Sequence, residues 1–383
     1  MGSFRGKEAS GRARLRLAVA LAGALCLLGL AARTSAGELL RPPSGQIFFG
    51  ATDTGKLDDF EDFAESVGKH PPVIETFHTW GGNLHYAIPR WGAAQARPML
   101  HISTADSNTL QEIITPRGIA TGTSDDYLIR LNSSFGTRQI RAYIRPLGEV
   151  NRCLNAWAAY SCTGASRGGS YTPFWYKQAF RRIAIILRGG GTLAQINAKL
   201  DAIDLPPLDR QAKDGAEPDS LPAAPISLVW SPLPGGSPAT KQNRPIHFYP
   251  GARYVDWVGT DIYSRYPVWR TLTRFYRTKK FRRKPFALTE WGVSAGDDPK
   301  FVKKVFAWVR HHKRTRMLIY YQDFGPSNVY RIQNYPKSRR VIARNLRQRR
   351  YPELAPYPPT LPPPGTPTDP SQPPAPPTGG TGG

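Results

Sequence analysis

The fold is decided by short apolar runs that stop on a polar residue, as in Phe286-Ala287-Leu288-Thr289-Glu290-Trp291-Gly292. A charge at the end of an apolar strand is costly to bury unless it is paired or functional. This run is therefore typical of a buried strand that reaches a site. Together with seven further runs it makes a set of eight: 46–49, 73–80, 97–103, 139–149, 226–231, 255–264, 285–291 and 317–324.

Segments with a helical pattern separate most of these runs, and this alternation predicts repeated βα units with a parallel sheet. The expected helices are 57–67, 83–91, 124–131, 173–187, 268–276, 299–311 and 338–349. Eight such units predict an α/β protein with a single (β/α)8 TIM-barrel catalytic domain. Residues 189–224, rich in Gly, Pro and Asp, are expected to form an excursion with one short helix at 193–202.

The two ends of the chain differ in composition from its middle. Residues 17–32 form an uncharged apolar run behind three arginines, which is typical of a secretory signal peptide over residues 1–36. An uncleaved anchor is the alternative, although a membrane span needs about 20 apolar residues. Residues 351–383 contain 13 of the 37 prolines and no Lys or Arg, which predicts a disordered tail or linker. Residues 37–350 then form the barrel.

The positive charge belongs to the barrel. Residues 37–350 hold 46 of the 52 basic and 25 of the 28 acidic side chains, a net charge of about +21. Such an excess often indicates nucleic acid, but the signal peptide and the lack of a binding motif argue against a specific nucleic acid. An anionic cell-wall or surface polymer is the expected electrostatic partner, and a merely solvated Arg-rich surface is the alternative. We expect a monomer.

Two cysteines remain after removal of the signal peptide. Cys153 and Cys162 lie in the loop that follows the fourth run. Because an exported protein matures in an oxidising compartment, they are predicted to form a disulfide.

The active site of such a barrel lies at the carboxyl ends of its strands, so the residues at which the runs stop are the candidates. They are His78, Trp80, Arg145, Glu149, Trp230, Asp261, Tyr263, Glu290, Trp291, and Gln322 or Asp323. His78 has an alternative role as an ordinary interior histidine. The three tryptophans are large enough to belong to the core, and indole rings also stack on sugar faces.

Two carboxylates in this set point to a reaction. Because side chains alternate along a strand, the residues of the fourth run that share a face are Tyr143, Arg145, Leu147 and Glu149. The fourth and seventh strands lie opposite each other, so Glu149 and Glu290 can flank one substrate bond. This is the geometry of glycoside hydrolysis, in which one carboxyl stays protonated and the other ionised. Arg145 and Tyr263 are candidates to hold Glu290 anionic.

Three motifs carry a resemblance: Arg145-Pro146-Leu147-Gly148-Glu149-Val150-Asn151, Val255-Asp256-Trp257-Val258-Gly259-Thr260-Asp261-Ile262-Tyr263 and Thr289-Glu290-Trp291-Gly292. Together they resemble the β-mannanase type of glycoside hydrolase family 26, whose members are retaining (β/α)8 enzymes of clan A. Further similarity lies at 176–183 and 229–232, and the resemblance spans nearly all of 47–344.

The resemblance implies roles for single residues. Glu149 would be the acid/base and Glu290 the nucleophile, with Tyr263 as its hydrogen-bond partner. Trp230 would be a platform on which a sugar ring stacks. The family usually carries His immediately before the acid/base, where this chain has Gly148, so one expected sugar or carboxylate contact is missing.

The sequence therefore predicts a secreted, retaining glycoside hydrolase that cleaves a β-linked polysaccharide, β-mannan-like or related, internally by double displacement. No cofactor and no metal are expected, because the histidines show no metal-ligand spacing and no Gly-rich phosphate loop stands out. The competing class is a non-catalytic glycan-binding or wall-associated barrel, supported by the charge, the Pro-rich end and Gly148. Two opposed carboxylates favour the enzyme, since a lectin has no need for both.

Overall fold

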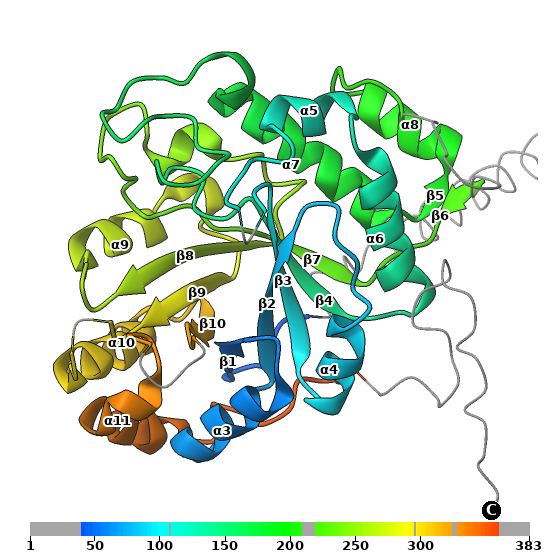
Figure 1. Cartoon of the computed structure of the whole chain (residues 1–383). Coiled ribbons are helices and arrows are strands. Elements are labelled where there is room, and N and C mark those ends of the chain that lie inside the picture. Colours follow the sequence, from blue (N-terminus) through cyan, green and yellow to red (C-terminus); the bar gives the residue numbers. More distant parts are fainter. Residues whose placement is uncertain (1–39, 107–108, 209–218, 295, 324–327, 360–383) are drawn as a thin grey trace, which may run out of the picture. The chain divides into compact units, whose positions relative to one another are not determined.

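A computed structural model describes residues 40–106, 109–208, 219–294, 296–323 and 328–359 (Figure 1). The predicted signal peptide, residues 1–36, and residues 360–383 of the predicted tail lie outside these ranges. All described residues belong to one unit that begins at Leu40. Among them, no helix has both the length and the apolar character that crossing a bilayer requires.

Eight parallel strands close into a barrel, which confirms the predicted fold class. They are β1 (Phe48–Thr52), β2 (Val73–Thr79), β3 (Arg97–Ser103), β4 (Ala142–Pro146), β7 (Ile226–Trp230), β8 (Trp257–Tyr263), β9 (Phe286–Gly292) and β10 (Thr315–Tyr320). Around the barrel the order is β1-β10-β9-β8-β7-β4-β3-β2. Each predicted run overlaps one of these strands, and the common strand direction brings all carboxyl ends to one end of the barrel.

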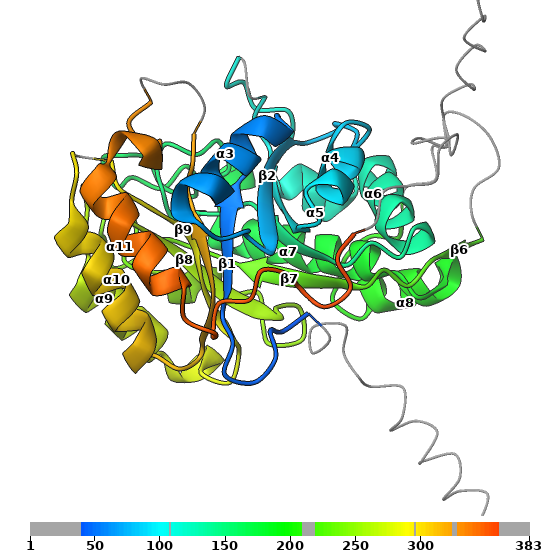
Figure 2. The same ribbon diagram turned by 90° about the horizontal axis from the view of Figure 1, so that it is seen from below.

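Helices surround the barrel (Figures 1 and 2). They are α3 (Leu57–Val67), α4 (Ala87–Ala93), α5 (Pro116–Thr121), α6 (Asp125–Thr137), α7 (Pro173–Arg188), α8 (Leu193–Asp201), α9 (Trp269–Tyr276), α10 (Pro299–His311) and α11 (Pro336–Leu346). The helix α5 was not predicted. It has only six residues, which is too short for an apolar period, although the Thr115 side chain caps it by accepting from the Gly118 amide at 3.0 Å.

The predicted excursion at 189–224 is a small sheet and a helix. Strands β5 (Gly191–Thr192) and β6 (Ser220–Leu221) pair antiparallel. The helix α8 follows β5, and its capping box joins Thr192 and Gln195 reciprocally, which satisfies amide groups that the first helical turn leaves free.

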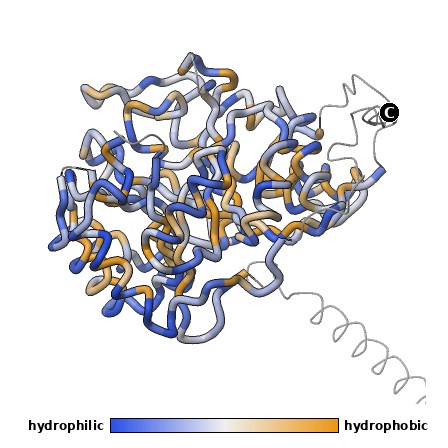
Figure 3. The backbone as a smooth tube through the Cα atoms, turned by 60° about the horizontal axis from the view of Figure 1, so that its bottom comes forward, coloured by the Kyte–Doolittle hydropathy of each residue, from blue (hydrophilic) through white to orange (hydrophobic). Residues whose placement is uncertain are grey.

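Apolar side chains pack in two shells, and Figure 3 shows hydrophobic residues gathered along the central strands. The larger shell lies between the strands and the helices. The smaller one fills the barrel interior near the amino ends of the strands, with Phe48, Met99, Tyr143 and Trp257 among its members. Beyond these residues, toward the carboxyl ends, the interior becomes polar.

The end of the barrel at which the strands begin is closed by residues from both ends of the described chain. The Arg97 guanidinium, at the amino end of β3, donates to the carbonyl oxygen of Leu40 at 3.1 Å and also to that of Pro356. Tyr351 and Ala355 are buried. The packed part of the chain therefore continues past Arg350, where the sequence prediction placed the start of the tail, because these few side chains still find apolar partners.

Candidate active site

Arg145 lies at the centre of the polar end of the barrel and is fully buried. Its Nη1 donates to Glu75 Oε1 on β2 at 3.0 Å and to Glu290 Oε1 on β9. Its Nη2 donates to Asp261 Oδ2 on β8 at 2.6 Å, and its Nε donates to Ser231 Oγ at 2.5 Å. One guanidinium thus connects residues of four different strands or strand ends.

The charges in this cluster shift one another's pKa values. Burial alone would lower the pKa of Arg145, but the carboxylates of Asp261, Glu290 and Glu75 outweigh burial and raise the pKa well above its usual value. Burial raises the pKa of Glu75 to about 8, against the opposing effect of Arg145 and with a further rise from Glu290. Burial likewise raises the pKa of Asp261 well above its usual value, despite Arg145.

These shifts leave the charge of Arg145 available to Glu290. Glu75 is mostly protonated at neutral pH, since its pKa is about 8. The second oxygen of Glu290, Oε2, accepts from the Tyr263 hydroxyl at 2.5 Å. Burial and the neighbouring Glu290 raise the pKa of Tyr263 well above its usual value, so this hydroxyl keeps its proton. Both oxygens of Glu290 are therefore occupied as acceptors, as suits a carboxylate.

Glu149 reaches the site by a turn and not by strand alternation. The strand β4 ends at Pro146, and both Leu147 and Glu149 adopt left-handed backbone conformations with φ of 52° and 50°. Leu147 consequently packs in the larger apolar shell, between the strands and the helices. The expectation that it shares an inward face with Arg145 is therefore wrong. Such conformations cost about 1 kcal/mol or more for a non-glycine residue and persist only where the surroundings impose them.

Two hydrogen bonds impose this turn. The Glu149 amide donates to the Ser231 carbonyl at 2.7 Å. The Trp157 indole Nε1 donates to the Gly148 carbonyl at 2.9 Å. The following loop is held by the disulfide between Cys153 and Cys162, which confirms that prediction.

The electrostatic surroundings of Glu149 differ from those of Glu290. Burial raises the pKa of Glu149, and the charge of Glu290 raises it further. Arg152 opposes this rise, because its Nη1 donates to Glu149 Oε2 at 2.9 Å. The side chain of Arg152 is 44% exposed, so water screens its effect. Glu149 thus favours the protonated form relative to an ordinary glutamate.

A histidine that the sequence analysis missed occupies the space next to Gly148. His101 lies on β3 opposite Arg145, and a Cβ atom at position 148 would lie 3.0 Å from His101 Nε2 and 3.0 Å from Arg145 Cζ. Burial lowers the pKa of His101 well below its usual value, and Arg145 lowers it further. The ring is neutral, and within the described residues neither of its nitrogens has a hydrogen-bond partner.

Four predicted substrate contacts lie elsewhere. Trp230 and Trp291 have no exposed surface and pack in the larger shell, so the predicted sugar platform at Trp230 is wrong. Trp80 is also buried in the larger shell, and its indole Nε1 donates to Ser124 Oγ at 3.1 Å. His78 follows the inward-facing Phe77 on β2 and therefore points outward, and burial lowers its pKa.

Other aromatic rings surround Glu290 and were not predicted. Tyr263 contacts Tyr330 and Tyr321, with ring centroids 5.4 and 6.0 Å apart. Tyr321 also contacts Phe77 at 5.9 Å. Phe77 is 41% exposed, so it offers an open ring face beside the carboxylates.

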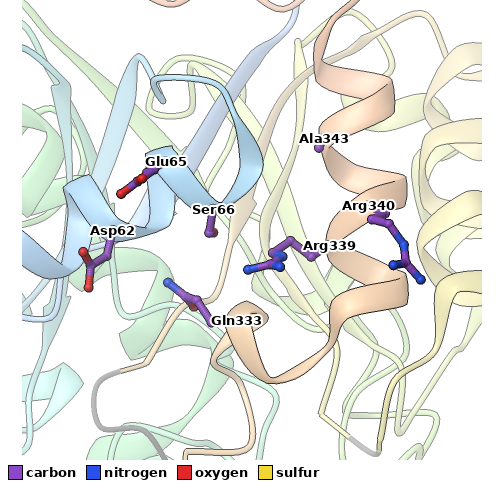
Figure 4. Close-up of a pocket in the computed structure, with 7 residues that line it drawn as sticks. All are labelled: Asp62, Glu65, Ser66, Gln333, Arg339, Arg340 and Ala343. Carbon is purple, nitrogen blue, oxygen red and sulfur yellow. The ribbon is translucent and has the colours of Figure 1, made fainter.

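In the described part of the chain, no group of three or more His, Cys, Asp and Glu side chains could hold a metal ion. Two cavities lie on the outside of the barrel. One, of about 510 Å³, is lined by residues of α3 and α11 (Figure 4). The other, of about 320 Å³, is lined by residues between 234 and 281. Neither is lined by Glu149 or Glu290.

The fold and the polar strand ends together define a (β/α)8 barrel with an acidic site. No protein-family model matches the sequence, and no curated protein matches it. Among solved structures, a family 26 (GH26) β-mannanase from Bacteroides ovatus is 16% identical with a TM-score of 0.51, covering 83% of this chain and 92% of its own. The GH26A structure from a Muricauda species is 14% identical at 0.51, covering 82% and 92%. The YdhT protein of Bacillus subtilis is 15% identical at 0.51, covering 84% and 90%.

Proposed function

We propose that this chain is a secreted, retaining glycoside hydrolase of the family 26 type that cleaves a β-linked polysaccharide, β-mannan-like or related. The observation that carries the proposal is the unequal setting of two carboxyl groups at one end of the barrel. Glu290 accepts from Arg145 and Tyr263, whereas burial and Glu290 raise the pKa of Glu149. Unequal carboxyl groups of this kind divide the roles of nucleophile and acid.

The proposed reaction has two steps. Glu290 attacks the anomeric carbon while Glu149 donates its proton to the departing glycosidic oxygen, which gives a glycosyl-enzyme and a shortened sugar chain. Glu149, now ionised, takes a proton from water, and the resulting hydroxide character displaces Glu290 from the anomeric carbon. The two displacements together retain the anomeric configuration, and Glu149 ends the cycle protonated again.

The raised pKa of Glu149 suits both steps. Before the first step the negative charge of Glu290 helps to keep the proton on Glu149. Once Glu290 is esterified that charge is gone, so the pKa of Glu149 falls and the residue can act as a base. For direct attack we expect the two carboxyl groups to lie about 5 to 6 Å apart, whereas a separation near 9 Å would indicate inversion.

Substrate contacts follow from the same end of the barrel. His101 is neutral, and both its ring nitrogens are buried without a hydrogen-bond partner among the described residues, so a donor and an acceptor lie just beneath the site next to Gly148. Phe77 offers an exposed ring for stacking. The similar structure from Bacteroides ovatus is that of a β-mannanase, so β-mannan is the first polymer to test.

The test is hydrolysis of a panel of plant, fungal and bacterial wall polysaccharides, with sizing of the products and NMR of the first-formed anomer. We expect one β-linked polymer to be shortened internally with retention. The Glu290→Gln variant is the control for contaminating activity. Tight binding to one polymer without release of any product would favour the non-catalytic glycan-binding alternative.

A further inference from the structure

The net positive charge of the barrel is concentrated in about its last quarter. Residues 265–350 contain 24 Lys and Arg against four Asp and Glu, whereas residues 37–264 contain 22 against 21. One of the four acidic residues, Glu290, is buried in the candidate site. The surface formed by residues 265–350 is therefore almost uniformly cationic, and the rest of the barrel is close to neutral.

Exposed cations form one stripe on each of three helices. They are Arg270, Arg274 and Arg277 on α9 and its end, Lys300, Lys303 and Lys304 on α10, and Arg340, Arg344 and Arg347 on α11 and its end. Spacings of three, four and seven residues place side chains on one helix face. Within the described residues none of these nine side chains forms an ion pair with a carboxylate.

The three helices lie side by side and form one surface, which we call the basic face (Figures 1 and 2). The α9–α10 contact includes the Trp308 indole, which donates to Thr273 Oγ1 at 3.0 Å, and Trp269 packs on Phe301 with centroids 5.6 Å apart. The contact between α10 and α11 follows from the strand order, since these helices come after the neighbouring strands β9 and β10.

The basic face has a sharp border at α3. Figure 4 shows Arg340 on α11, with Asp62 and Glu65 on α3 across the cavity that these residues line. Exposed residues of α3 are mainly acidic: Asp58, Glu61, Asp62 and Glu65. A polyanion would therefore be attracted to α9, α10 and α11 and repelled at α3.

We propose that the basic face binds an acidic, uronate-bearing polysaccharide that surrounds the neutral substrate. Arginine-rich surfaces bind carboxylates through paired N–H groups. Of the described large apolar side chains that are exposed, none lies on α10 or α11 or within 269–284, and only Tyr266 and Val268 lie just before α9, so the stripes carry no exposed aliphatic or aromatic side chain for insertion into a bilayer or for stacking on nucleic-acid bases. The choice of a polysaccharide as the partner rests on the proposed function. The cationic surface itself is an observation that holds whether or not the proposed function is right.

The direction of the stripes relates this face to the site. Each outer helix runs antiparallel to the strand before it, so Arg270, Lys300 and Arg340 are the stripe residues nearest to the end of the barrel that carries Glu149 and Glu290. The stripes therefore run along the outside of the barrel toward the end that carries the candidate site. Binding on this face therefore holds the protein in an acidic matrix while the site stays free for a neutral chain.

The test compares two full-length variants of equal net charge. The first carries Arg270→Gln, Arg277→Gln, Lys300→Gln, Lys303→Gln, Arg340→Gln and Arg344→Gln. The second replaces six exposed cations elsewhere by Gln, namely Lys56, Arg130, Lys199, Lys241, Arg244 and Arg253. Binding to polygalacturonate is measured between about 0.05 and 0.5 M NaCl, a range over which exposed charges become screened. Neutral β-mannan, double-stranded DNA and phosphatidylglycerol vesicles are the comparison ligands.

We expect the wild-type chain to bind polygalacturonate at low salt and to be released as salt rises. The first variant should lose about tenfold or more in affinity, and the second less than about threefold, because only the first removes clustered charge. Equal losses in both variants, or tighter wild-type binding to DNA or vesicles than to polygalacturonate, would overturn the proposal. Hydrolysis of the preferred neutral substrate is measured in parallel, so a barrel that binds polygalacturonate but hydrolyses nothing refutes the proposed function alone.

Discussion

Charge is arranged in opposite ways inside the barrel and on its basic face. Inside, Arg145 is surrounded by Glu75, Asp261 and Glu290, and each of these groups is buried and hydrogen-bonded. On the basic face, nine cations lie in water without carboxylate partners in the described structure. The first arrangement fixes the positions of the buried side chains and shifts their pKa values. The second creates a positive electrostatic potential over the surface.

The difference teaches which properties each region controls. Removing one member of a buried charge cluster leaves the others unpaired in a poor solvent, so single substitutions have large effects. Single exposed charges contribute little, and salt screens them. Chemistry should therefore depend on individual buried residues, whereas attachment should depend on the number of exposed ones.

The largest expected effect is that of Glu290→Ala. Loss of the nucleophile should lower kcat by roughly 10³-fold or more on every substrate, whatever its leaving group. Steady-state kinetics on polysaccharide and on an activated aryl glycoside measure it, and circular dichroism checks the fold. Glu65→Ala, an exposed carboxylate on α3, is the matched control. Equal activity in the two variants would show that buried and exposed carboxylates do not differ here.

The Glu149→Ala variant should fail selectively. Without a proton donor, polysaccharide cleavage should fall by about 10² to 10⁴-fold, but an activated aryl glycoside, whose phenolate leaves unaided, should still form the glycosyl-enzyme. Added azide should then speed turnover and give a glycosyl azide of retained configuration. Loss on both substrate types without azide rescue would mean that the roles are assigned wrongly.

Replacing Glu75 by Gln should change how stability depends on pH. The folded pKa of Glu75 is about 8, raised from an ordinary value of 4.5, so between these pH values the folded state holds a proton that the unfolded state has lost. Stability contributed by this group therefore falls as pH rises through that window, by at most about 1.4 kcal/mol per pH unit. Gln keeps the acceptor for Arg145 but does not titrate.

Thermal unfolding from pH 5 to 8 measures this effect. The Tm difference between Glu75→Gln and the wild type should grow in favour of the variant as pH rises, and Glu65→Gln should run parallel to the wild type. A constant difference for both variants would show that Glu75 does not hold its proton through this range.

The smallest effect is expected from Arg152, the partly exposed cation beside Glu149. Arg152 lowers the pKa of Glu149, so Arg152→Ala should raise that pKa and keep the acid protonated to higher pH. The basic limb of the kcat/KM profile should move upward, by less than about one unit because water screens the pair. Arg130→Ala, which breaks an exposed ion pair on α6, should leave the profile unchanged. A downward movement would contradict the assignment of Glu149 as the acid.

The sequence predicted the barrel well because its evidence is repeated eight times. Apolar runs of strand length alternate with helical periods, and single errors such as the missed α5 do not change the count. The end of a strand was predicted less well where the backbone conformation of a turn, and not the hydrophobic pattern, determines it. The fourth run continues past Pro146 in composition, but the left-handed backbone at Leu147 ends the strand, and no pattern of hydrophobicity predicts that conformation.

The site was predicted in part, and the misses have one cause. Outside the fourth run, the candidates rest on their position where a run stops and not on the face of the strand that they occupy. Ser231 and Glu290 point inward to Arg145, so their neighbours Trp230 and Trp291 point outward into the core. Glu75 was missed although a carboxylate in the middle of an apolar run is itself a signal.

The closure at Arg97 has a practical consequence for handling the molecule. The guanidinium holds Leu40 and Pro356 at the amino end of β3, the end of the barrel opposite the carboxylates. A fusion partner, affinity handle or solid support joined ahead of Leu40 or after residue 359 therefore approaches the barrel from behind. Whichever of the two ends is attached, the end of the barrel with the carboxylates faces away from the attachment point. An immobilised protein should therefore remain accessible to large polymers.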